Sequence, residues 1–295
     1  PFLTWNGSAF VGTPGLDEAG TYWINISAYS PGGLLETYAN ESFEILPMPR
    51  SLRINSDADM LAAVNEFKWT GDGSADDPFI VTGLVIDSLG IFENSLFIGN
   101  VTYHFVVTEN SLGNHIPEKV WNYWSDTIGA ALYIYNCQYA AVVDNYLWGG
   151  NLGYMDTGMV LLHSDGVVVS ENLLEDFAGS GIRVLDDCYG TRIENNTLSG
   201  PYDTGTGIMI IGAYGTMIRN NSVNAFYCGI GVNHEGFIPV GGETIIMDNQ
   251  VNDFDVGISL DKTENISIIN NTLTNGDGFD FQMGMSLWYV GNVTI

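Results

Sequence analysis

The chain has 295 residues, 45% of them hydrophobic, and it carries 35 acidic but only 8 basic side chains, for a formal net charge of -27. This length and apolar content suffice for one large or two smaller folded domains. The scarcity of Lys and Arg argues against nucleic acid or an anionic membrane surface as a partner, because both attract positive charge. No apolar run reaches the length of a membrane span, so we expect no direct membrane insertion of this segment.

Residues 1–47 carry strand and turn signals. Residues 20–27 alternate like a half-buried strand, and residues 42–46 indicate another. This is too little for a sandwich of about seven strands. The segment at residues 10–14, followed by residues 19–28, resembles the closing half of the Ig-like, cadherin-like modules of prokaryotic surface proteins. That resemblance implies a β-sandwich whose first half lies upstream of Pro1.

Residues 48–78 are predicted to form a linker and a short capping helix. Pro47 and Pro49 mark the linker, and Ser56 offers an N-cap with Asp59 three residues later. A helix at the start of a solenoid can cover the open end of its first coil and block edge pairing. The apolar residues expected on one helical face are Met60, Leu61, Val64 and Phe67.

The loop at residues 71–78 alternates acidic residues with Gly and Ser, as a calcium-binding loop does. No Glu follows at the distance where such loops supply a bidentate ligand, which favours a solvated turn, with calcium as the alternative. We expect no other cofactor. The four His residues never show metal-ligand spacing, which argues against a zinc or copper site.

Residues 79–295 repeat one pattern at spacings of 22 to 28 residues. An Asn followed two residues later by an apolar residue recurs, and a Gly with an apolar run precedes each one. Such a period, without helical patterns between the repeats, predicts an all-β solenoid, a right-handed parallel β-helix. We expect each Asn to adopt the left-handed backbone region at a corner and to bond its equivalents in the coils above and below. This ladder would consist of Asn145, Asn172, Asn196, Asn221, Asn249 and Asn271.

The last residues repeat the preceding coil at a constant offset of 27 and stop before the Asn corner. A solenoid cut there would expose strand edges and an apolar cross-section. We therefore expect the β-helix to continue beyond Ile295.

We expect Cys137 and Cys188 to stand two coils apart, which at the usual strand spacing is a separation of roughly 9.6 Å. That separation is beyond the reach of a disulfide. The three cysteines are thus expected to be buried thiols.

Nine Asn-x-Ser/Thr sequons favour an extracellular, N-glycosylated chain. In the pair Asn195-Asn196 we expect the first Asn on the outward side of a strand and the second at the buried corner. Chance is the alternative, because Asn, Ser and Thr are common in β-helices. The candidate glycosylation sites are Asn6, Asn25, Asn40, Asn100, Asn195, Asn220, Asn265, Asn270 and Asn292.

The stretch from Trp69 to Val81, then Gly83 to Asp87 and coils of the form Gly-Ile and Ile-x-x-Asn-x-Leu, resembles the NosD-like or CASH-type β-helix proteins. Many of these are predicted archaeal surface proteins. The likeness covers roughly residues 50–295. It implies a pectin-lyase-like solenoid and an association with carbohydrate binding or processing and with cell-surface assembly, but a fold alone does not fix an activity.

Polar residues five to six positions after each coil's Gly are the candidate catalytic residues. His163 and Asp186 would stand one coil apart, with Arg183 on the second of these coils, so a general acid–base pair is one interpretation. Gly212 and Ala213 interrupt the row, and no Gly-His-Gly or Arg-x-Lys element of the polygalacturonase kind is present. A catalytic site also needs a convergent pocket. We therefore favour surface polar residues over an enzyme.

Aromatic residues gather between the Asn corner and the next coil's Gly. Exposed Trp and Tyr suit sugar stacking or a subunit contact, and the alternative is a satellite cluster folded over the coil. The candidates are Trp121, Tyr123, Trp124, Trp148 and Tyr154.

Together these patterns predict an extracellular structural or adhesive module of a cell-envelope protein or surface filament. Its expected partners are copies of itself, other envelope proteins or glycans. Two alternatives stay open. One is a polysaccharide lyase, hydrolase or epimerase that acts in a groove, and the other is a glycan-binding module without turnover.

Overall fold

The computed structural model describes residues 51–88, 94–113, 129–149, 156–201, 204–234, 242–274 and 283–295, and the backbone of four strands before residue 46. Its contacts divide the chain into two compact units, Pro1–Pro49 and Arg50–Ile295. In the first unit, β1 (Thr4–Trp5) pairs antiparallel with β2 (Phe10–Val11). A longer hairpin joins β3 (Gly20–Tyr29) to β4 (Leu35–Ile45), so the second strand is longer than the one expected at residues 42–46. The Ig-like resemblance stays a prediction.

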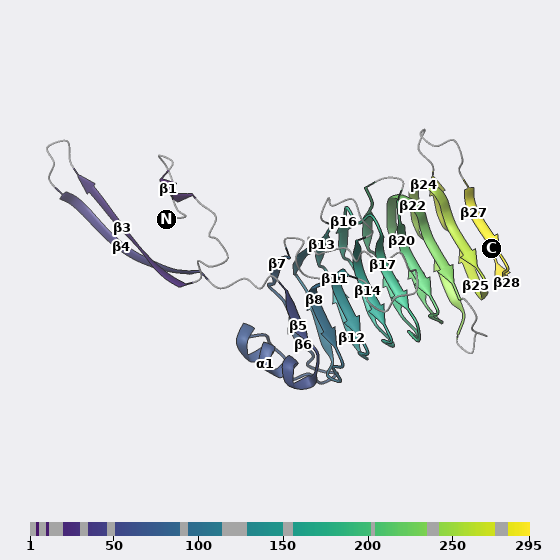
Figure 1. Ribbon diagram of the computed structural model, residues 1–295, viewed down its shortest axis with the longest axis horizontal. Helices are drawn as coiled ribbons and strands as arrows, with labels where there is room; N and C mark the ends of the chain where they lie inside the picture. The colour runs from purple at the N-terminus through teal and green to yellow at the C-terminus, as the bar shows by residue number, and fades with distance from the viewer. Residues whose placement is uncertain are drawn as a thin grey trace. The chain divides into compact units, whose positions relative to one another are not determined.

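The second unit is the predicted right-handed parallel β-helix, in which every described strand pairs parallel with its equivalents in the neighbouring coils (Figure 1). Each coil places one strand on each of three faces. The first face consists of β5 (Leu52–Ile54), β8 (Asn94–Gly99), β11 (Ala130–Tyr135), β14 (Thr157–Leu162), β17 (Ser180–Leu185), β20 (Thr206–Ile211), the second halves of β22 (Ser222–Asn233) and β24 (Gln250–Asp261), and β27 (Met283–Trp288).

The second face follows the first in each coil, and the third follows the second. The second face consists of β6 (Phe79–Val81), β9 (Phe105–Thr108), β12 (Ala140–Val143), β15 (Val168–Ser170), β18 (Arg192–Glu194), β21 (Met217–Arg219), β23 (Thr244–Met247), β25 (Glu264–Ile269) and β28 (Gly291–Thr294). The third face consists of β7 (Val85–Asp87), β10 (Ser111–Gly113), β13 (Tyr146–Trp148), β16 (Leu173–Glu175), β19 (Thr197–Ser199), the first halves of β22 and β24, and β26 (Thr272–Thr274).

A helix, α1 (Asp57–Phe67), lies between β5 and β6 of the first coil. Ser56 is its N-cap and accepts a hydrogen bond from the Asp59 N–H, while the Asp59 carboxylate accepts one from the Asn55 N–H. Met60 and Ala63 are buried and join the interior of the β-helix, as a cap on the first coil requires. Leu61 does not, since it is 41% exposed. Its predicted place on the apolar face was wrong, because that face is narrower than the sequence pattern indicated.

The repeated glycines keep the coils narrow. They stand at the start of the first face, and side chains of the third face fill the space where their Cβ would lie. A Cβ on Gly181 would stand 2.5 Å from Leu198 Cδ2 and 2.7 Å from the carbonyl oxygen of Gly207 in the next coil. The glycine is therefore needed for close approach inside the coil rather than for a positive φ.

A ladder of buried asparagines lines the corner between the second and third faces. From Asn110 to Asn249, each side-chain nitrogen donates to the side-chain oxygen of the next Asn over 2.9 to 3.0 Å, and also to a main-chain carbonyl of the coil before. Asn110 begins this ladder but was absent from the prediction. It was missed because 35 residues separate it from Asn145, a longer spacing than that of the other repeats.

The prediction of the backbone at this corner was wrong in one respect. The ladder Asn does not adopt the left-handed region. The residue before it does, with φ between 53° and 59° at Glu171, Asn195 and Asn270, for example. That preceding residue turns the chain and projects its side chain outward, while the Asn satisfies the polar groups inside.

Candidate functional site

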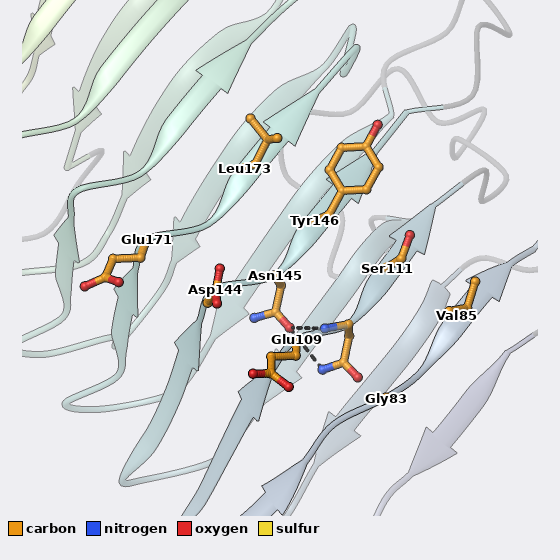
Figure 2. Close-up of a pocket in the computed structure, with 10 residues that line it drawn as sticks. Gly83, Val85, Glu109, Ser111, Asp144, Asn145, Tyr146, Glu171 and Leu173 are labelled. Atoms are coloured by element: carbon orange, nitrogen blue, oxygen red, sulfur yellow. Dashed lines mark hydrogen bonds between the residues drawn. The ribbon is translucent and has the colours of Figure 1, made fainter.

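An open groove of about 450 Å³ lies where the second face turns into the third, over the first four coils. Two rows of side chains form it (Figure 2). One row runs along the strands of the third face, in register from coil to coil: Val85, Ser111, Tyr146 and Leu173. The other row consists of the carboxylates at the corner: Glu109, Asp144 and Glu171.

The first row exposes apolar surface. Val85 is 49% exposed, Tyr146 is 40% exposed and Leu173 is 38% exposed. Strand alternation explains their direction, since the intervening residues point inward and are buried. An aromatic ring flanked by aliphatic side chains offers a surface on which a ligand's apolar face can stack.

The second row owes its position to the left-handed corner. Glu109, Asp144 and Glu171 have φ of 54°, 55° and 59° and directly precede ladder asparagines. The N–H of Glu109 donates to the carbonyl of Asp144 over 3.0 Å, so these residues belong to adjacent coils, about 4.8 Å apart. Three carboxylates in a line provide hydrogen-bond acceptors along one edge of the groove and repel anions.

Tyr146 also has a fixed orientation. Its hydroxyl donates to Glu175 Oε2 over 3.0 Å. Partial burial, followed by this hydrogen bond and the negative charge of Glu175, raises the pKa of Tyr146. The phenol therefore stays protonated at neutral pH. Trp148, the one aromatic candidate in the described ranges, covers Gly113 of the preceding coil, where a Cβ on the glycine would stand 2.4 Å from the Trp148 ring.

The candidate catalytic residues do not converge. The His163 N–H donates to the Asp186 carbonyl over 3.1 Å, so the two are in adjacent coils, but the His163 imidazole approaches Asp187 instead, with 3.9 Å between Nδ1 and Oδ2. The Asp186 carboxylate turns away toward Gly212, where a Cβ would stand 2.6 Å from Oδ1. Arg183 points outward from the middle of the first face. These residues also lie on another side of the coil from the groove.

The sequon asparagines of the described β-helix share one backbone feature. All have positive φ, and all but the half-buried Asn265 are exposed: Asn100, Asn195, Asn220, Asn265, Asn270 and Asn292. Asn195 stands one residue beyond β18, at the corner and not on the outward side of the strand as predicted. Asn220 Nδ2 donates to Asn195 Oδ1 over 2.6 Å. The side chains of Asn25 and Asn40, and all of Asn6, lie outside the described residues, as do Trp121, Tyr123, Trp124 and Tyr154.

The described residues contain no grouping of three or more His, Cys, Asp or Glu side chains that could hold a metal ion. The predicted loop at residues 71–78 closes on its own hydrogen bonds, since the Asp72 carboxylate accepts from the Ser74 N–H and the Asp77 carbonyl accepts from Asp72 and Gly73. Within these same ranges, no helix has the length and hydropathy needed to cross a bilayer.

Comparison with known proteins identifies the family. The model described as "Periplasmic copper-binding protein (NosD)" matches residues 87–293, well over half of the chain. The chain belongs to the NosD family. The periplasmic description is consistent with the predicted extracellular location, and the cell-surface placement stays a prediction. No curated protein matches the chain.

Solved structures share the fold at low sequence identity. A mutant tailspike protein of E. coli bacteriophage HK620 in complex with a pentasaccharide matches 72% of this chain with a TM-score of 0.51 and 14% identity. A mutant DFA-IIIase from Arthrobacter chlorophenolicus A6 in complex with DFA-III matches 69% with a TM-score of 0.50 and 14% identity. This NosD-family chain spans only 41% and 46% of those two proteins, and the likeness shows the β-helix fold alone.

Copper, which the family description implies, finds no converging set of His and Cys side chains among the described residues. Copper prefers imidazole, thiolate or thioether ligands that converge on one point. His104 stacks on Tyr139, His163 lies beside Asp187, and His234 is buried against Thr263. Burial raises the pKa of Cys137 to about 11, and that of Cys188 and Cys228 to about 12. All three cysteine side chains are buried.

The groove was not anticipated from the sequence. Its acidic residues occupy the position before the ladder Asn, which varies among Glu, Asp and Asn and so shows no repeat. A usable signal was present, because Glu109, Asp144 and Glu171 each directly precede an Asn of the repeat.

Proposed function

We propose that this chain is a non-catalytic glycan-binding module with an adhesive role in an envelope or cell-surface protein. The observation that carries the proposal is the groove on the third face, where exposed Val85, Tyr146 and Leu173 lie beside a line of carboxylates. A sugar presents apolar C–H faces and hydroxyl groups, which match an aromatic wall and a row of acceptors.

A further observation supports a glycan as the ligand. Of the two structures of the same fold described above, one was determined with a pentasaccharide and the other with DFA-III. N-glycans on the exposed sequons would suit the same surface location, and glycopeptide mapping of the native protein tests them.

Titration of the purified chain with a panel of oligosaccharides tests the proposal. We expect binding without cleavage and, for Tyr146→Ala, a loss of affinity of about tenfold, or about 1.4 kcal/mol, because the stacking surface is removed. Tyr139→Ala is the matched control, since Tyr139 is similarly exposed but lies between the first and second faces, where it stacks on His104.

Two results would contradict the proposal. One is the absence of binding to any glycan in the panel. The other is cleavage of a bound glycan that is lost in Asp144→Asn or Glu171→Gln, because carboxylate pairs at a suitable separation catalyse glycoside hydrolysis. The second result would assign the groove to a hydrolase.

A further inference from the structure

The outward positions of the third face extend the groove along the β-helix. Beyond the fourth coil, two columns of outward side chains continue in register with Tyr146 and Trp148. Every one of them is a hydroxyl or an amide, and every one is exposed or half-buried. The first column holds Thr197, Ser222, Gln250 and Thr272, and the second holds Ser199, Asn224, Asn252 and Thr274.

The residues directly before each ladder Asn form a corner column, which borders these two columns over their whole length. After Glu109, Asp144 and Glu171 it continues through Asn195, Asn220, Asp248 and Asn270, all at positive φ. The acceptors and donors of the third face thus form a strip parallel to the β-helix axis. Coils repeat at about 4.8 Å along this strip, and alternate residues of a strand stand about 7 Å apart across it.

Only a ligand that runs along the axis meets this pattern in every coil. A sugar unit in an extended glycan advances by a length close to the coil repeat, so each coil can present one set of hydrogen-bonding groups to one sugar. A ligand that crosses the strip would reach the side chains of a single coil. This match between the length of one sugar unit and the spacing of the coils favours a linear polysaccharide over a compact saccharide.

Charge selects the class of polysaccharide. Neither outward column of the third face nor the corner column contains Lys or Arg in the described coils, while Glu109, Asp144, Glu171 and other carboxylates border the strip. The arginines nearest the corner, on the second face, pair with carboxylates: Arg192 with Glu194 at 2.9 Å and Arg219 with Asp248 at 3.7 Å. With a net charge of -27, this surface repels uronate or sulfated chains.

We infer that the third face binds a neutral linear polysaccharide laid along the β-helix axis, about one sugar per coil, with the groove at Tyr146 as its stacking site. This deepens the glycan-binding function proposed above and rests on it. The hydroxyl and amide field of the later coils then sets how many sugars are bound, while the carboxylate row excludes anionic chains.

Affinity as a function of oligosaccharide length tests this inference. Neutral gluco- and manno-oligosaccharides, from disaccharide to octasaccharide, are titrated into the chain made in a host without N-glycosylation. Affinity should rise steadily with length. Ser199→Arg, which places a bulky side chain on the strip two coils beyond Tyr146, should weaken octasaccharide binding at least tenfold and leave disaccharide binding unchanged.

Ser170→Arg is the matched control, because Ser170 is also half-buried and ends a three-residue strand but points outward from the second face. Ser170→Arg should change neither the affinity for the disaccharide nor the affinity for the octasaccharide. Asn252→Arg, two coils further along the strip, provides a second variant should Ser199→Arg fail to fold, and circular dichroism checks each one. Its effect should likewise be confined to long oligosaccharides.

The outcomes separate this inference from the proposed function. An octasaccharide that binds no more tightly than a disaccharide would overturn the axial strip and leave glycan binding in place. Tighter binding of alginate or polygalacturonate oligomers, or of the cationic oligomers of chitosan, would overturn the neutral class. Absence of binding to every saccharide would overturn both proposals together.

Discussion

At the scale of single residues, two consecutive residues form the corner between the second and third faces, and each has a different role. The first residue of each pair takes the left-handed backbone conformation and faces solvent, and the second, always Asn in the described coils from Asn110 to Asn271, bonds inside. Asn is suited to both places, because its short amide tolerates positive φ and also supplies donors and an acceptor. This explains why Asn-Asn pairs and sequons recur at this corner.

The ladder gives the first prediction. Asn196→Leu removes the amide that donates to Asn221 and to two main-chain carbonyls, and it also removes the acceptor of the buried Asn172 N–H. We expect a loss of about 1–3 kcal/mol in the free energy of unfolding, measured by urea titration. Asn195→Asp is the control, because it keeps the exposed corner and an acceptor for Asn220. Equal stability of Asn196→Leu and wild type would contradict the ladder's role.

His234 gives a pH-dependent prediction. It is 2% exposed, its Nδ1 lies 2.7 Å from Thr263 Oγ1, and its ring packs on Tyr214. Burial lowers the pKa of His234, and a hydrogen bond with the main chain of Ala213 partly opposes this. The unfolded chain then binds the proton more readily than the folded chain once the pH falls below about 6.5. Stability from neutral His234 is complete above that pH and declines below it.

Thermal unfolding between neutral pH and pH 5 measures this effect. His234→Gln should flatten the decline seen for the wild type over that interval. Identical pH profiles for the wild type and His234→Gln would show that burial of this imidazole has no influence on acid stability.

At the scale of elements, the sequence allowed the β-helix to be predicted because interior positions repeat. Gly and Asn are each demanded by a contact with the next coil, so Gly recurs at one place of the coil from Gly158 onward and Asn at another from Asn110 onward. The groove follows from outward positions, which have no such constraint. Alternation shows that Tyr146 and Leu173 point outward, but only the lengths of the turns in each coil determine that they share a face.

The same limit applies to the candidate catalytic row. Counting residues from each Gly correctly brought His163 and Asp186 into adjacent coils, yet their side chains diverge. Two left-handed residues in succession, Asp186 and Asp187, rotate the chain at this turn. Such a local change in backbone direction leaves no trace in the spacing of the repeat.

The capping helix gives the element-scale prediction. Met60 is fully buried in the end of the β-helix, whereas its neighbour Leu61 is 41% exposed on the same helix. Met60→Ala should cost about 2–5 kcal/mol and promote association through the uncovered edges of β5 and β6. Leu61→Ala should stay within about 0.5 kcal/mol of the wild type. Chemical unfolding and light scattering measure the two effects, and equal losses in both variants would contradict a capping role for α1.

At the scale of the whole molecule, charge acts on stability and on recognition in different ways. A net charge of -27 with only 8 basic residues means that most carboxylates have no cationic neighbour, so the folded chain repels itself. Salt screens this repulsion, since the Debye length falls from about 30 Å at 0.01 M to about 8 Å at 0.15 M. Binding of a neutral glycan, in contrast, forms no ion pair that salt could weaken.

The last prediction joins these two consequences. Between 0.01 M and 0.15 M NaCl, the midpoint of thermal unfolding should rise by about 2–4 °C if screening relieves about 1 kcal/mol of repulsion. The affinity for a neutral octasaccharide should stay constant over the same range. KCl is the control for a specific ion effect and should act like NaCl. An affinity that falls with salt would mean that charged groups hold the ligand, and an affinity that rises would mean that the ligand is itself an anion repelled by the carboxylate row.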